Sequence, residues 1–527
     1  MAPEVGLYGA HVTCKRVELF LPEDRTVQCG WYRGFFFEMI RPGMLMAFRD
    51  FLLLPGNDMA SIQQFWKIRL PHSSSQIRER GVGSMEFITG VKEKETLEIS
   101  DVLKGDMTGK EIRMNGAVHT IRDMGDVAFV VLRKREGLVQ CVYEEGVTNF
   151  DIKQLKEASA VEVTGTVAAE ERAPQGFEIR LKKMEILSEP AQPLPLAISK
   201  WKLNTSLEAK LNMRSVSLRN IRERAKFRIQ EGIVRGFREF LYVQGFTEIH
   251  TPKIGAKGAE GGANLFRFEY FHHPAVLAQS PQFYKQMMVG VFDRVFETGP
   301  VFRAEKHNTK RHLNEYTSMD FEMGYIDGFE DIMAMETGFL QYMLNLLKTE
   351  YAKELKILNV TLPSADHIPT VRFDEAKRLV SEKYDRAIRN PYDLEPEEEH
   401  LIGRYFQEEY GSDFVFVTHY PSKKRPFYAM DDPADPKFTL SFDLLFKGLE
   451  ITTGGQRIHD YQMLLDKIAA RGMTAEGMEQ YLDTFKYGMP PHGGLGIGLE
   501  RLAMQLLDEE NVRETCLFPR DLSRLEP

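Results

Sequence analysis

Two short stretches of the sequence each carry an arginine where it could bind a phosphate. The first is Phe302–Glu305, followed by Arg311–Leu313, and it is predicted to form a strand, a loop and a second strand. The second is Gly496–Arg501, in which a glycine turn is predicted to open a helix. Arginine suits such sites because its planar guanidinium binds phosphate through two hydrogen bonds and keeps its charge. A Gly-x-Gly turn alone is usually a plain helix start, but the two stretches together predict a phosphate site.

Both stretches fall in a region, from residue 206 onward, where helix and strand patterns alternate as in a large α+β domain. Ser215–Val243 has helical periodicity and several arginines, and it stops at Gly245. Phe246–Ile249 is then predicted as a strand that leads to Thr251-Pro252. Taken alone, this segment could equally be an ordinary amphipathic helix.

A second region, about 107–188, is predicted to be all strand. Its β-branched, alternating segments are bounded by glycine and charge, and they are Glu111–His119, Ala128–Arg133, Leu138–Tyr143, Val161–Ala168 and Phe177–Leu187. A helical patch near Ile152–Ala158 lies between the third and fourth strands. Five strands with a helix after the third are typical of the OB-fold. The proline-rich segment that follows, within 189–205, predicts a hinge.

The bulk properties limit the class of protein. A chain of 527 residues is too long for one core. It is 43% hydrophobic and 28% charged, with no apolar run long enough for a bilayer, so we expect no membrane partner. Its four cysteines are scattered, without zinc-ligand spacing, which favours the reducing cytoplasm. The net charge of −9 excludes a uniformly basic surface but allows a local nucleic-acid site. Residues 1–84 show no motif, and we interpret them either as a dispensable N-terminal extension of unknown role or as the result of a start assigned upstream of Met85.

The two phosphate-binding stretches resemble motifs 2 and 3 of the class II aminoacyl-tRNA synthetases, and the 215–252 segment resembles motif 1. The resemblance implies an α+β fold. An OB-fold β-barrel at 107–188 would bind the anticodon, and a class II catalytic domain at 206–527 would contain an antiparallel sheet flanked by helices. Motif 1 implies a homodimer with this segment at its centre.

The resemblance is strongest to the aspartyl-tRNA synthetases of the archaeal and eukaryotic branch. The most specific matches are Gln279–Lys285, Glu260–Gly262 and Gly454–Asp460. Asparaginyl-tRNA synthetases share motifs 2 and 3, but Met319–Met323 and the Gln456–Asp460 run favour the aspartyl enzymes. The family usually has serine where this chain has Thr453, whose methyl group is extra.

Amino acid activation brings a carboxylate onto the α-phosphate of ATP. Because both partners are anionic, the site must supply cations and in-line geometry rather than a nucleophile. The resemblance implies that Arg303 holds the α-phosphate and the aspartate carboxylate, and that Arg501 clamps the γ-phosphate; these are the expected catalytic residues. Glu450 and Thr453 would hold Mg²⁺, which prefers oxygen ligands.

By the same resemblance, two sets of side chains would bind the substrates. The expected ATP-binding residues are Arg303, Glu305, Arg311, His312, Leu313, Glu450, Gly498, Leu499, Glu500 and Arg501. The expected aspartate-binding residues are Glu260, Gln282, Lys285, Arg303, Thr453 and Arg457. Lys285 and Arg457 would hold the side-chain carboxylate, whereas asparagine would leave this pair unmatched at a cost of several kcal/mol. A single Arg–Glu pair is more often a solvated ion pair, so the prediction depends on the whole set.

The OB-fold implies a tRNA partner. Phe129 and Gln140 match family positions that stack on and hydrogen-bond the anticodon uridine, and stacking contributes about 1–3 kcal/mol per base. A tryptophan and a lysine accompany strict recognition of tRNA(Asp) in the family; His119 and Pro174 stand at those positions here. This pair resembles the relaxed type, which also charges tRNA(Asn) with aspartate for a separate amidotransferase. The alternatives are an asparaginyl-tRNA synthetase, or a non-catalytic paralogue that binds tRNA.

Overall fold

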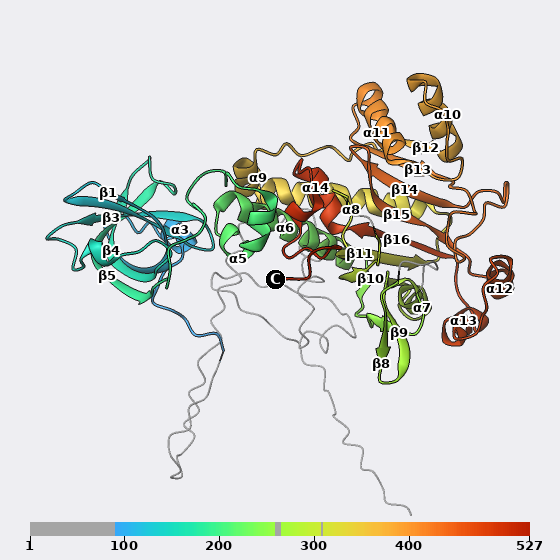
Figure 1. Cartoon of the computed structure of the whole chain (residues 1–527), viewed down its shortest axis with the longest axis horizontal. Helices are drawn as coiled ribbons and strands as arrows, with labels where there is room; N and C mark the ends of the chain where they lie inside the picture. Colours follow the sequence, from blue (N-terminus) through green and yellow to red (C-terminus); the bar gives the residue numbers. More distant parts are fainter. Residues whose placement is uncertain (1–89, 259–264, 307–308) are drawn as a thin grey trace, which may run out of the picture. The chain divides into compact units, whose positions relative to one another are not determined.

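The computed structural model describes residues 90–258, 265–306 and 309–527 of the chain (Figure 1). The predicted N-terminal extension, residues 1–84, and the predicted site residue Glu260 lie outside this part. None of the helices described is both long and apolar enough to cross a membrane.

The first element group is a closed barrel with the strand order β1-β2-β3-β5-β4. The strands are β1 (Glu111–Asp123), β2 (Val127–Arg133), β3 (Leu138–Glu144), β4 (Ala160–Ala169) and β5 (Phe177–Ser188). Buried and half-buried residues alternate along β4, because successive side chains of a strand point to opposite faces. The predicted OB-fold is therefore confirmed. The helical patch is a single 3-10 turn, η1 (Ile152–Gln154), and α3 (Ile99–Lys104) precedes the barrel.

Residues 189–205 form neither helix nor strand, as the prolines predict. Three helices follow: α4 (Leu207–Asn212), α5 (Arg214–Ser217) and α6 (Ile221–Val243). The predicted helix over 215–243 is broken because the Asn220 side chain accepts hydrogen bonds from the backbone N–H groups of Arg222 and Glu223. This N-cap makes α6 begin at Ile221. Gly245, at a φ of +78°, ends the helical segment before β6 (Thr247–Glu248).

The α+β domain predicted from residue 206 onward contains a sheet of eight strands, in the order β12-β13-β14-β15-β16-β11-β10-β6. The strands not yet given are β10 (Arg294–Phe302), β11 (Glu315–Gly324), β12 (Thr370–Arg372), β13 (Phe414–Thr418), β14 (Ser441–Phe446), β15 (Leu449–Arg457) and β16 (His492–Gly498). Its pairings are antiparallel except for β12–β13 and β10–β6. This is the sheet that the class II resemblance implies.

Helices bury the apolar surface of this sheet. Those that follow in the chain are α7 (Gln282–Phe292), α8 (Glu330–Glu350), α9 (Ala352–Leu358), α10 (Phe373–Tyr384), α11 (Pro396–Tyr410), α12 (Tyr461–Ala470), α13 (Glu479–Lys486) and α14 (Leu499–Leu506), with the 3-10 turn η2 (Val512–Thr515). Phe237 of α6, Phe339 of α8 and Phe321 of β11 belong to one buried cluster. Helices α10 and α11 pack beside β12 and β13, at one end of the sheet (Figure 1).

A smaller sheet has the order β7-β9-β8. Its strands are β7 (Ile254–Gly255), β8 (Arg267–Tyr270) and β9 (His273–Leu277). Phe271 and His272 connect β8 to β9, both with positive φ, as a two-residue hairpin of type I′ requires.

Candidate active site

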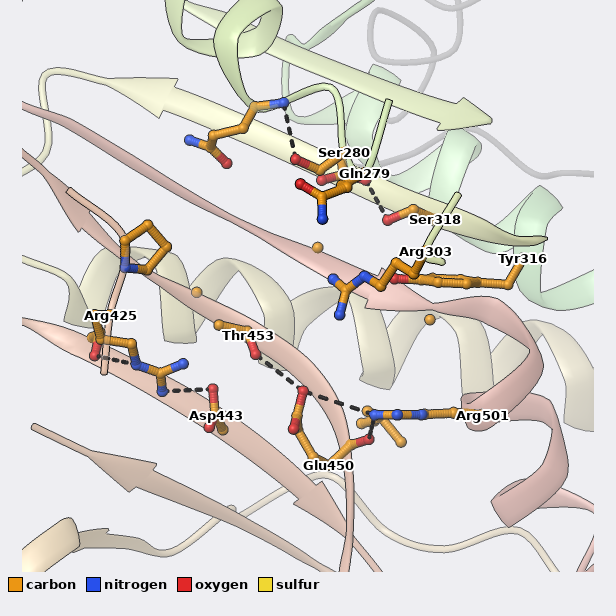
Figure 2. A pocket seen from close by; sticks show the side chains of 18 of the residues that line it. Gln279, Ser280, Arg303, Tyr316, Ser318, Arg425, Asp443, Glu450, Thr453 and Arg501 are labelled. Atoms are coloured by element: carbon orange, nitrogen blue, oxygen red, sulfur yellow. Dashed lines mark hydrogen bonds and ion pairs between the residues drawn. The ribbon is translucent and has the colours of Figure 1, made fainter. Parts of the chain in front are cut away.

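A cavity of about 340 Å³ lies over β11, β14, β15 and β16. It gathers residues that are far apart in the sequence, and Figure 2 shows several of them around it. The predicted substrate-binding residues that line it are Gln282, Lys285, Arg303, Glu305, Arg311, His312, Leu313, Glu450, Thr453, Arg457, Gly498, Glu500 and Arg501. Leu499 does not line it, because its side chain is only 4% exposed and packs in the core. Sequence patterns separated by up to two hundred residues thus converge on one place.

The loop between β10 and β11 forms one wall. The Asn314 amide donates to the backbone oxygens of Arg303, at 2.8 Å, and Glu305, at 3.0 Å, and so holds the start of the loop. The Arg303 guanidinium lies 5.7 Å from the centre of the Tyr316 ring. This contact keeps a cation at the cavity wall without neutralising it.

Arg501 comes from the first turn of α14, directly after β16. Its Nη1 donates to the Glu450 backbone oxygen at 3.1 Å, and its Nε donates to the Arg311 backbone oxygen at 3.3 Å. The predicted glycine turn is wrong in form: Gly498 has an ordinary φ of −78°, and the glycines belong to the strand. Another glycine of this strand, Gly494, is needed for close approach, since a Cβ there would lie 2.1 Å from the Phe321 backbone oxygen.

Carboxylates and a hydroxyl meet beside Arg501. The Thr453 hydroxyl donates to Glu450 Oε1 at 3.1 Å, and Arg425 Nη2 donates to Asp443 Oδ1 at 2.7 Å. In Figure 2, Glu450 lies between Arg501 and the Arg425–Asp443 pair. Burial and the neighbouring Glu450 raise the pKa of Asp443 to about 6, against the pull of Arg425. The negative charges of Asp443 and Glu450 therefore act on each other at this side of the cavity.

At another part of the cavity two buried cations face two buried carboxylates. Lys285 Nζ lies 3.0 Å from Asp320 Oδ1 and 3.3 Å from Glu322 Oε2. Arg457 Nε donates to Glu322 Oε1 at 2.8 Å, and its Nη2 donates to the Gly494 oxygen at 2.8 Å. Burial alone would raise the pKa of Glu322, but Arg457 and Lys285 outweigh it, so the pKa is lowered. The group thus contains two basic and two acidic side chains, whose formal charges cancel.

Two other predicted residues differ in their surroundings. Gln282 is 3% exposed, and its Nε2 has no hydrogen-bond partner within the described part of the chain, so a donor at the cavity is left for a ligand. Glu500 accepts from the Thr317 backbone N–H with both oxygens at 3.1 Å. Its side chain thus ties α14 to β11, and burial raises its pKa to about 7.

On the barrel, Phe129 and Gln140 are half-buried and lie on neighbouring strands, with Gln140 opposite Val131. Because Phe129 and Val131 are two residues apart on β2, all three side chains share one face. Gln140 Nε2 donates to Glu178 Oε2 at 3.1 Å. His119, in contrast, is 3% exposed in a β-bulge, and burial lowers its pKa to about 4. Pro174 is exposed. The structure therefore buries the His119 imidazole instead of exposing it on a surface that could contact tRNA.

Sequence reasoning missed several charged residues in or beside the cavity and on the barrel. Asp320 and Glu322 were noticed only as part of a motif, and Asp443 was not noticed. A signal existed, because each acidic residue stands between two apolar neighbours in a strand, where burial requires a partner. Arg425 lies in a loop that has no pattern of its own, and Glu178 resembles any exposed strand residue in the sequence.

Comparison with known proteins decides the family. The family described as tRNA synthetases class II (D, K and N) matches residues 206–522, and the OB-fold nucleic acid binding domain matches residues 112–187. The chain belongs to the class II tRNA synthetases. It is 48% identical, over 425 residues, to the aspartate–tRNA(Asp/Asn) ligase of Deinococcus radiodurans, which covers 80% of this chain and 96% of that protein. It is 42% identical, over 434 residues, to the aspartate–tRNA(Asp) ligase of Pyrococcus furiosus, covering 81% of this chain and 99% of that protein.

Solved structures of this class II family resemble the chain as well. The asparaginyl-tRNA synthetase of Pyrococcus horikoshii, complexed with asparaginyl-adenylate, has a TM-score of 0.73 at 32% identity and covers 80% of this chain and 97% of that one. The aspartyl-tRNA synthetase described as putative from Leishmania major has the same TM-score and identity, covering 84% and 97%. The fold is therefore common to both specificities, and the side chains of the cavity have to distinguish them.

Proposed function

We propose that this synthetase activates L-aspartate with ATP and transfers it to tRNA(Asp), and to tRNA(Asn) as well. The observation that carries this proposal is the cavity in which Arg303 and Arg501 lie with Lys285 and Arg457. Relatives named aspartate–tRNA(Asp/Asn) ligase or aspartate–tRNA(Asp) ligase, at 39–48% identity, support aspartate over asparagine.

The phosphate end of the cavity is built to bind an extended anion. Arg303 would meet the α-phosphate as the aspartate carboxylate attacks it, and Arg311 and Arg501 would hold the outer phosphates. Arg501 is oriented by two backbone oxygens, and its Nη1 also lies 3.8 Å from Glu450 Oε1, so the guanidinium is fixed at the cavity. Fixed cations that face developing negative charge lower the barrier without reorganising during the reaction. Glu305 and His312 would complete this end of the ATP site; His312 Nε2 lies 3.7 Å from Glu305 Oε2.

Glu450 and Thr453 suit Mg²⁺, and Asp443 joins them. Within the described residues no three acidic, histidine or cysteine side chains are grouped closely enough to hold a metal ion by themselves. That agrees with Mg²⁺, which is commonly bound by one or two carboxylates together with substrate phosphates. When bound, it would neutralise phosphate charge; the residues of this chain would fix where it enters. The Thr453 hydroxyl already points to Glu450, so the methyl group does not prevent this contact.

Aspartate selection is assigned to the charged network. A substrate carboxylate beside Lys285 and Arg457 gains cationic partners that are held in place by Asp320 and Glu322. The amide of asparagine carries no charge and would lose most of this attraction. The Nε2 of Gln282, which has no hydrogen-bond partner among the residues that the structure describes, would supply a further polar contact at the substrate.

The tRNA partner would lie on the barrel face that carries Phe129 and Gln140, where Glu178 orients the Gln140 amide. His119 and Pro174 would set the breadth of recognition. Because His119 is buried and Pro174 has no side-chain donor, neither offers a group that could reject the third anticodon base of tRNA(Asn). Aspartate on tRNA(Asn) would then pass to an amidotransferase, in the cytoplasm, where thiols such as Cys141 and Cys516 stay free.

We also infer a homodimer. The smaller sheet and the loop before it expose a row of apolar side chains, of which Phe271 is 79% exposed; the others are Ile254, Phe266, Phe268 and Tyr270. Tyr242 and Val243, at the end of α6, are exposed too. An apolar surface of this kind is typical of a protein interface, and it adjoins the segment that resembles motif 1.

The decisive experiment is ATP–pyrophosphate exchange with aspartate and with asparagine, followed by charging of purified tRNA(Asp) and tRNA(Asn). We expect exchange with aspartate alone and charging of both tRNAs. Exchange with asparagine alone would identify an asparaginyl enzyme, and no exchange with either would indicate a tRNA-binding paralogue.

A further inference from the structure

Glu399 lies outside every motif that carries the family resemblance, yet it reaches one of the arginines of the cavity. It belongs to the first turn of α11. This turn is fixed by two contacts of its neighbour Glu398, which accepts from the Glu395 backbone N–H at 2.7 Å and from Lys377 Nζ at 2.6 Å. Lys377 and Glu398 are 4% and 1% exposed, so the start of α11 is held rigidly against α10.

From this position Glu399 contacts Arg311. Its Oε2 accepts from Arg311 Nη1 at 2.9 Å, and its side chain is 9% exposed. Arg311 lines the cavity, whereas Glu399 does not, so the carboxylate lies behind the guanidinium. Among the described residues, the hydrogen bonds of the Arg311 side chain involve Nη1 alone. Nε and Nη2 are therefore left to donate elsewhere.

The surroundings argue against an ordinary stabilising ion pair. Burial and the negative charge of Glu450 raise the pKa of Glu399 to about 7, although Arg311 and Arg501 pull it down. A carboxylate held in such a place costs free energy, and buried ion pairs are weak evidence of stability. The pair instead restricts a long side chain at the point where an anion would arrive, and restricting a binding group in advance lowers the entropic cost of binding.

We propose that Glu399 is a positioning residue that holds the Arg311 guanidinium, through Nη1, in the orientation in which its remaining N–H groups meet the outer phosphates of ATP. The inference rests on the proposed function, because it needs ATP at this end of the cavity. It extends the site to α11, in the segment between the two phosphate-binding stretches. Glu399 acts through Arg311 and touches no substrate.

The test uses Glu399→Ala, Glu399→Gln and the matched control Glu397→Ala, whose glutamate lies in the same helical turn but is exposed. In ATP–pyrophosphate exchange, Glu399→Ala should raise the KM for ATP about tenfold, as loss of an orienting partner commonly does. The KM for aspartate and kcat should stay within about twofold, since the aspartate end is untouched. Glu399→Gln keeps an acceptor oxygen for Nη1 and should recover most of the ATP KM. Glu397→Ala should change neither constant.

Arg311→Ala separates this inference from the proposed function. If Arg311→Ala leaves the KM for ATP unchanged, the placement of ATP at this end is wrong. If Arg311→Ala raises that KM but both Glu399 variants leave it unchanged while remaining folded, only the inference fails. In the Arg311→Ala background, Glu399→Ala should add less than about twofold, because the two residues act as one unit. If Glu399→Ala and Glu399→Gln both raise the KM for ATP and the KM for aspartate by the same factor, the damage is general and the inference is overturned.

Discussion

Replacing Arg457 by leucine tests the aspartate site most directly. Arg457 donates to Glu322 at 2.8 Å and to the Gly494 oxygen at 2.8 Å, and its side chain is 7% exposed. Leucine removes the cation that would face the substrate carboxylate. Removing one partner of a buried charge pair costs about 2–5 kcal/mol, and about 4 kcal/mol corresponds to roughly a thousandfold loss of kcat/KM for aspartate.

The structure adds a consequence for stability. Glu322 is 0% exposed, and without Arg457 its ion-pair partner among the described residues would be Lys285, which also serves Asp320. An orphaned buried charge costs about 3–5 kcal/mol of folding free energy. Arg457→Leu should therefore lower the urea midpoint as well as the activity, which the sequence alone would not suggest.

A double variant separates the two effects. Arg457→Leu combined with Glu322→Gln removes the orphaned charge, so it should regain most of the lost unfolding free energy while remaining inactive with aspartate. ATP–pyrophosphate exchange over an aspartate titration and urea unfolding are measured on the same preparations. Near-normal exchange in Arg457→Leu would remove Arg457 from the substrate pocket. Recovery of exchange in the double variant would show that the single variant failed through misfolding.

The remaining predictions concern tRNA range, assembly and pH. The wild-type enzyme should charge tRNA(Asn) at a rate within a hundredfold of the rate for tRNA(Asp), because one missing base contact changes the free energy by about 1–3 kcal/mol. The double variant His119→Trp with Pro174→Lys should slow the charging of tRNA(Asn) more than the charging of tRNA(Asp). Because His119 is 3% exposed, the unfolding of this variant is measured too. Sedimentation should show a dimer at micromolar concentration, and a monomer that still charges tRNA would contradict the motif 1 interface. Burial raises the pKa of Glu336 from 4.5 to about 8. As the pH rises from 5 to 8, the unfolded chain therefore releases a proton that the folded protein keeps. The free energy of unfolding of the wild type should fall over this range by up to about 1.4 kcal/mol per pH unit. Glu336→Gln keeps the acceptor for the Thr452 hydroxyl, 2.6 Å away, and should remove that slope; identical urea midpoints against pH for both proteins would refute it.

Local chemistry explains where the sequence-based predictions succeeded. The barrel strands are short and alternate, and period-two patterning fixes which face is buried. The hinge follows from prolines, and the end of α6 follows from Gly245. The start of α6 was misplaced because Asn220 is an ordinary polar residue in the pattern until its side chain is seen to cap the helix. Gly496 and Gly498 were mistaken for a turn because the strand that contains them, β16, pairs with β11 and β15, which are distant in sequence.

The sequence by itself predicted the OB-fold and the family, and it singled out the arginines proposed for the site, because motifs, periodicity and turn residues are local features of a sequence. Only the tertiary structure decided how charge is balanced. It placed Asp320 and Glu322 against Lys285 and Arg457, Asp443 beside Glu450, and Glu399 behind Arg311. Electrostatic partners are chosen by distance in space and by burial, which a sequence does not record. The same reason explains His119, whose burial follows from a β-bulge rather than from its residue type.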